Sequence, residues 1–66
     1  MNQKTIFTIS LIEKDGKISA IAQACGNNPT TFEIGYEIMA SLEKAAFNHP
    51  HMNLRVEPLA YSERLQ

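Results

Sequence analysis

The chain has 66 residues, 44% of them hydrophobic and 20% charged, and six lysine and arginine residues against seven aspartate and glutamate residues give a formal net charge of −1. We expect residues 1–66 to form one small domain with a marginal core, because a chain of this length buries only about 60% of the surface that it exposes when unfolded. The scattered basic residues argue against a nucleic-acid-binding protein, whose affinity depends on clustered positive charge.

The N-terminal apolar stretch and the single cysteine bear on the cellular compartment. Cys25 has no second cysteine with which to form an intrachain disulfide, which is typical of proteins in reducing compartments. The stretch from Ile6 to Ile12 is interrupted by Thr8 and Ser10, unlike the continuous apolar region of a signal peptide. No segment reaches the roughly 20 apolar residues that span a bilayer. We therefore expect a cytoplasmic protein with no membrane association.

The first predicted elements are the two strands of a hairpin. Residues 5–13 are rich in β-branched and apolar types, and Asp15-Gly16 follows, the dipeptide typical of a two-residue turn. On one face of this hairpin, large residues of the first strand lie opposite alanines of the second strand. The small alanines leave a shallow trough in which a helix could pack. The predicted register pairs Lys14 with Lys17, Glu13 with Ile18, Leu11 with Ala20, Ile9 with Ala22 and Phe7 with Ala24.

The opposite face of the predicted hairpin has a mixed character. It would carry Ile6, Thr8, Ser10 and Ile12 against Cys25, Gln23, Ile21 and Ser19. One alternative is an ordinary solvent-facing side of an antiparallel sheet, in which a few β-branched residues favour the strand conformation. The other alternative is a binding surface, for which the candidate partner-binding residues are Ile6, Ile12 and Ile21.

A helix is predicted next. The segment 26–29 ends the second strand, and the residues from Thr30 to Glu33 match a capping box with Thr30 as the N-cap. The helix should continue to about residue 47 or 48, because Pro50 follows and the residue before a proline avoids the helical conformation.

The predicted helix is apolar over about twice the width that packing on one sheet requires. The centre of the sheet-facing side comprises Gly35, Ile38, Met39, Leu42 and Ala46, and Gly35 is expected to let the helix approach the alanine trough. Ile34 and Ala45 extend the apolar surface on one side. On the other side lies an aromatic flank, formed by Phe32, Tyr36 and Phe47, with Glu43 as a lone charge among them.

A third strand is predicted over residues 52–57, where apolar and polar residues alternate before Pro58. A right-handed crossover through the helix would place it parallel to the second strand and on the far side of the first, in the order 2-1-3. The predicted fold is therefore α+β, ββαβ, with a three-stranded mixed sheet and one helix on one face. The remaining residues, 59–66, are expected to be too short for an independent helix and able to fold back.

No group of residues predicts catalysis. His49-Pro50-His51 is a weak metal motif, because it lacks the ligand spacing of structural zinc sites. Cys25 has no nearby catalytic partners in the sequence and is expected to be a small buried residue. Glu33 and Glu37 lie on the solvated side of the helix, without the enclosure that acid-base chemistry needs. We expect neither an enzyme, nor a bound metal, nor a cofactor.

The functional hypothesis is a protein-interaction module that forms a homodimer. The surplus apolar flank of the helix or the mixed face of the sheet would be buried against a second copy, with Glu43 at the interface. The alternative is a monomeric inhibitor or adaptor, such as a phage or mobile-element accessory protein, that presents the aromatic flank to a different protein. In a third possibility, Leu59, Tyr61 and Leu65 cover this flank within the same chain.

The order of hairpin, polar loop, threonine-capped helix and short strand resembles the antitoxin half of HicB-type pairs and compact phage accessory proteins. The resemblance covers Phe7 to Ala46 as a pattern of elements. The Pro-Asp-x-Pro-Gly-type turn expected of HicB antitoxins does not occur between Ile18 and Thr31, so no residue role or activity is carried over.

Overall fold

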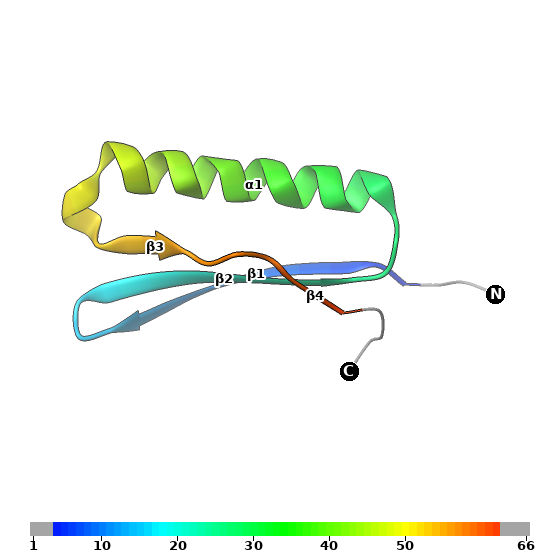
Figure 1. Ribbon diagram of the computed structural model, residues 1–66, viewed down its shortest axis with the longest axis horizontal. Helices are drawn as coiled ribbons and strands as arrows, with labels where there is room; N and C mark the ends of the chain where they lie inside the picture. Colours follow the sequence, from blue (N-terminus) through cyan, green and yellow to red (C-terminus); the bar gives the residue numbers. More distant parts are fainter. Residues whose placement is uncertain (1–3, 63–66) are drawn as a thin grey trace.

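The computed structural model describes residues 4–62. One helix lies along one face of a mixed sheet, as the α+β prediction required, and within the described residues no second layer covers the opposite face (Figure 1). The elements are β1 (Ile6–Lys14), β2 (Lys17–Cys25), α1 (Pro29–Asn48), the short 3-10 helix η1 (Pro50–Met52), β3 (Leu54–Val56) and β4 (Ala60–Ser62).

The β1–β2 hairpin has the predicted register from Lys14 opposite Lys17 to Phe7 opposite Ala24. Asp15 and Gly16 form its two-residue loop with φ angles of 54° and 79°, the left-handed conformation that a type I′ turn requires. The Gly16 N–H donates a hydrogen bond of 2.8 Å to Oε2 of Glu13, which further holds the turn. The turn residues therefore set the register, as the sequence indicated.

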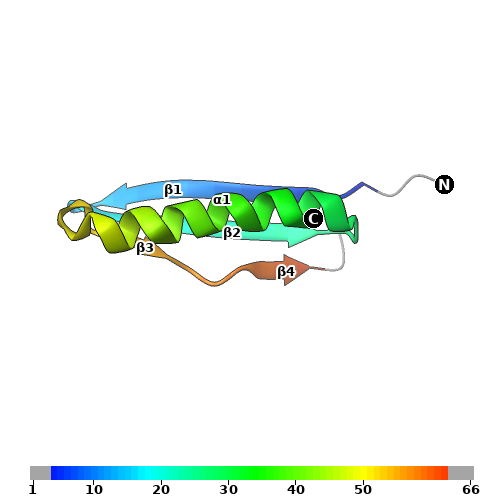
Figure 2. The same cartoon turned by 90° about the horizontal axis from the view of Figure 1, so that it is seen from above.

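The strand order differs from the prediction. β2, not β1, is central: β1 pairs with one of its edges, while β3 and β4 both pair with the other edge (Figure 2). The predicted parallel direction of β3 relative to β2 is confirmed, but the order 2-1-3 is wrong. The physical reason is the size of the side chains under the helix. The alanines of β2 are 2–4% exposed and leave room for α1, whereas Phe7 of β1 fits beneath the helix only where Gly35 has no side chain.

The edge of the sheet formed by β3 and β4 is interrupted. β3 is shorter than the predicted strand 52–57, because residues 50–52 form η1 and Pro58 has no N–H to donate. Backbone hydrogen bonds join Ile18 N–H to Asn53 O (3.0 Å) and Glu57 N–H to Ala20 O (2.9 Å). β4, which the sequence did not predict, continues the same edge beside the last residues of β2.

The helix begins two positions earlier than its capping pattern predicted. Asn28 is the N-cap, and its side-chain oxygen accepts a hydrogen bond of 3.1 Å from Thr31 N–H. Pro29 occupies the first helical position, for which its fixed φ is suited. The prediction of Thr30 as the N-cap is therefore wrong. The predicted end at about Asn48 is confirmed.

The core between the helix and the sheet is thin. Its buried residues are Ala20, Ala22, Ala24 and Met39. Cys25, which follows Ala24 on β2 and therefore lies on the other face of the sheet, is also buried, so the prediction of a small buried Cys25 is confirmed. Gly35 is also buried, but a Cβ atom added there would lie 2.6 Å from ring carbons of Phe7. The glycine therefore lets the helix approach Phe7 of β1, and not the alanine trough as predicted. None of the large side chains in the described part of the chain is fully buried.

Candidate protein interface

The predicted aromatic flank is divided in the structure. Phe32 and Tyr36 stack at 6.2 Å between ring centroids, and Phe7 reaches beneath the helix to meet them edge-on at 5.9 and 5.8 Å. Tyr61 of β4 packs on Phe32 at 6.1 Å and donates a 2.9 Å hydrogen bond to Gly26 O. Of the three residues predicted to cover the flank within the chain, Tyr61 covers Phe32, no contact of Leu59 with the flank is seen, and Leu65 lies outside the described residues.

The other two members of the predicted flank, Phe47 and Glu43, do not join this cluster. Phe47 is 85% exposed near the end of α1, and Glu43 is exposed as well. The ring of Tyr36 packs on Phe7 and Phe32, away from Glu43. Phe47 thus remains an isolated apolar side chain on the surface.

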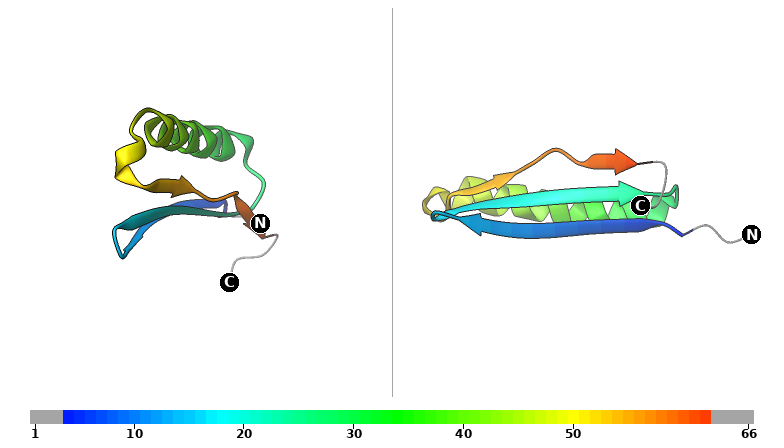
Figure 3. Two further views of the ribbon diagram at one scale, coloured as in Figure 1. Left: turned by 60° about the vertical axis from the view of Figure 1, so that its left-hand side comes forward. Right: turned by 90° about the horizontal axis from the view of Figure 1, so that it is seen from below.

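The three isoleucines predicted on the second face of the sheet lie there as expected. Ile6 and Ile21 are half-buried and Ile12 is 50% exposed. Figure 3, in the view from below, shows that the described residues place no helix over this face. Ile12 and Ile21 border a shallow hollow near the hairpin turn, together with Lys14, Asp15, Lys17 and Ser19.

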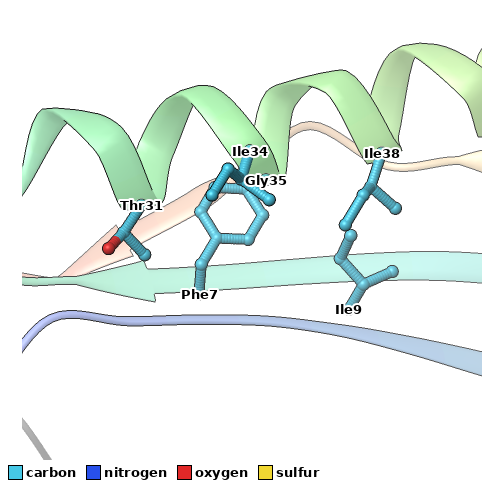
Figure 4. Close-up of a pocket in the computed structure, with 6 residues that line it drawn as sticks. All are labelled: Phe7, Ile9, Thr31, Ile34, Gly35 and Ile38. Carbon is cyan, nitrogen blue, oxygen red and sulfur yellow. The ribbon is translucent and has the colours of Figure 1, made fainter.

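A groove that the sequence did not predict lies on the other face, between α1 and β1. Its volume is about 330 Å³, and its lining residues are Phe7, Ile9, Thr31, Ile34, Gly35 and Ile38. Figure 4 shows the Phe7 ring directly below the helix at Gly35, and Ile9 pointing up toward Ile38. Thr31 brings the only side-chain polar group among the lining residues, so the groove lacks the several convergent polar groups that orient a small ligand.

Large apolar side chains border this groove and remain exposed. Ile34 is 58% exposed, Ile38 48% and Leu11, the next residue of β1 on the same face, 62%. The periodicity of the helix marked Ile34 as the border of the apolar surface and Ile38 as central. It could not show that α1 leaves β1 uncovered at Leu11, because this depends on how the helix crosses the sheet.

The two histidines of the weak metal motif lie close together. Their ring centroids are 5.8 Å apart, and the part of the chain described contains no group of three or more His, Cys, Asp or Glu side chains that could hold a metal ion. Between residues 4 and 62, no helix is both long and apolar enough to cross a bilayer. Comparisons with protein families, curated proteins and solved structures give no match to this chain.

Proposed function

We propose that this chain is a non-catalytic protein-interaction module that acts as a homodimer. The observation that supports the proposal is the amount of large apolar surface around a very small core. The buried core consists of alanines, one cysteine and one methionine. At least about half of each of the following side chains is exposed: Leu11, Ile12, Ile34, Tyr36, Ile38, Phe47 and Tyr61.

The small size of the chain supports the same proposal. A 66-residue core provides only marginal stability, and small domains often gain stability by oligomerisation. A stable protein interface typically buries about 800 Å² on each partner, so burial against a second copy would cover exposed apolar side chains and supply this stability.

A monomeric adaptor that presents its helix to a different protein is the second candidate. Phe47 favours it, because an 85% exposed aromatic side chain is a suitable anchor for a partner. Phe32 is a weaker candidate anchor than the sequence indicated, because Phe7 and Tyr61 already contact its ring.

Sedimentation equilibrium over a wide concentration range tests the proposal. We expect a single species of twice the chain mass at tens of micromolar and reversible dissociation on dilution. A folded monomer throughout this range would contradict the homodimer and would favour the adaptor, for which a pull-down experiment is the next step.

A further inference from the structure

Among the described residues, no strand pairs with the outer edge of β1, so its backbone N–H and C=O groups are free at alternate residues. A two-residue hairpin loop closes with a hydrogen-bonded pair, here Lys14 and Lys17, and such pairs alternate with non-hydrogen-bonded ones along antiparallel strands. The backbone groups of Phe7, Ile9 and Leu11 therefore point away from β2. The bonds from Ile18 N–H and to Ala20 O agree with this alternation, because they show the even residues of β2 facing β3.

The sequence of β1 is self-complementary about Ile9. Among residues 6–12, apolar side chains lie two and three positions to either side of Ile9, and the hydroxyl side chains of Thr8 and Ser10 lie one position to either side. If two copies of β1 paired antiparallel around a two-fold axis at Ile9, every pair would match in polarity. The pairs would be Ile9 with the partner's Ile9, Phe7 with the partner's Leu11, Ile6 with the partner's Ile12, and Thr8 with the partner's Ser10.

The same arrangement fills the groove beside α1. Leu11 of β1 is 62% exposed, and on its own chain the helix leaves it uncovered. In the Ile9-centred pairing, the partner's Leu11 lies directly opposite Phe7, which lines the groove together with Ile34. Directly opposed residues on one face have Cβ atoms about 5 Å apart, which is close enough for contact. Each leucine would therefore be buried by the groove of the other chain.

The helices also fit this pairing. Figure 2 shows the first half of α1 above the space between β1 and β2. Because the two-fold axis would run beside β1, the two helices would lie next to each other, and packed helices touch at about 8–10 Å between their axes. A two-fold axis perpendicular to the sheet leaves both helices on the same face, where the exposed Ile34 and Ile38 would face the second helix.

We propose that two copies of this chain join edge to edge through β1, with Ile9 opposite the partner's Ile9, to form one continuous sheet with both helices on the same face. The occupant of the groove between α1 and β1 is thus the partner's Leu11. This inference rests on the proposed homodimer and specifies its interface. A two-fold interface requires a surface that is complementary to itself, and the residues around Ile9 provide one.

Disulfide trapping tests the register. Thr8→Cys and Ser10→Cys are introduced separately into a Cys25→Ala background, and the two variants are mixed in equal amounts with oxidised glutathione. Both positions are exposed on the face away from the helix, so the substitutions should leave the fold intact. The mixture should form a covalent heterodimer at least about tenfold faster than either variant alone, because directly opposed Cβ atoms lie about 5 Å apart and diagonal ones about 7–8 Å.

The other outcomes are separable. Fast cross-linking of Ser10→Cys alone, or of Thr8→Cys alone, would contradict the Ile9-centred register and place the axis at that residue. A dimer in sedimentation with no fast cross-link in any mixture would overturn pairing through β1 and leave the homodimer standing. A monomer in sedimentation would overturn both.

Discussion

The two edges of the sheet differ in the features that control strand pairing. The β3–β4 edge consists of two three-residue strands separated by Pro58, and the exposed side chains of Arg55 and Glu57 form an ion pair of 3.0 Å there. The β1 edge is nine residues long and contains neither a proline nor a charge from Ile6 to Ile12. Short strands, prolines and charges are the means by which proteins prevent edge-to-edge association.

This difference indicates which edge of the sheet is protected against pairing with another chain and which edge is open to it. One edge carries the protective features, while the other presents a long apolar strand beside a groove lined by Phe7, Ile34 and Ile38. An unprotected edge would expose a monomer to uncontrolled aggregation. A closed two-fold pairing removes this risk, since each β1 covers the other and leaves only the protected edges free.

The largest expected effect comes from Leu11→Lys. Leu11 is already exposed in a single chain, so the fold should change little, but a lysine would bring a charge into the groove of the partner. Loss of two buried leucines, at about 1.5–3 kcal/mol each, should raise the dimer Kd by at least about 100-fold. Sedimentation equilibrium measures the change.

Phe47→Lys is the matched control for this variant. It places the same charge at another exposed apolar position on the helix-bearing side, remote from β1, and should change the Kd by no more than about twofold. If Phe47→Lys dissociated the dimer and Leu11→Lys did not, the interface would lie on the aromatic flank and not at β1.

A smaller effect is expected from Gly35→Ala, which disturbs the helix above β1. The new Cβ would lie 2.6 Å from ring carbons of Phe7. We expect a net loss of about 1–2 kcal/mol in the free energy of unfolding, because overpacking outweighs the gain of about 1 kcal/mol in helix propensity. Urea denaturation of the chain at fixed concentration measures it.

The effect of Gly35→Ala in a Phe7→Leu variant separates the overpacking against Phe7 from the gain in helix propensity. With Phe7→Leu the ring is gone, so the same alanine should stabilise the chain. Destabilisation of equal size in both backgrounds would show that Phe7 does not limit the approach of the helix.

The smallest effect is expected at the protected edge, from Arg55→Ala. The arginine side chain of the Arg55–Glu57 pair is 80% exposed, and exposed ion pairs contribute about 0–1 kcal/mol. The dimer Kd should stay unchanged, because this edge takes no part in the proposed pairing. A clear weakening of the dimer would instead place the interface at β3.

The elements that depend on local signals could be predicted from the sequence. Asp15-Gly16 set the hairpin register, and Pro50 set the end of the helix, because turn conformation and proline geometry act over a few residues. The N-cap was misplaced by two residues since two capping patterns overlap, and Pro29 favours the one that begins at Asn28.

The strand order and the candidate interface depend on which strand the helix covers, which no local pattern specifies. The crossover through the helix was expected to place the third strand beyond the first, but β3 pairs with β2, and β1 is left at the edge. The sequence therefore predicted Phe32 as a partner-binding residue, although it is largely covered, and did not predict Leu11, which is exposed.

Amide hydrogen exchange along β1 tests the central claim most directly, without any substitution. At concentrations where the chain is dimeric, the N–H groups of Phe7, Ile9 and Leu11 should exchange at least about 100-fold more slowly than at concentrations where it is monomeric, while those of Thr8 and Ser10 should be protected under both conditions. Rapid exchange of the Phe7, Ile9 and Leu11 amides in a dimeric sample would contradict pairing through β1.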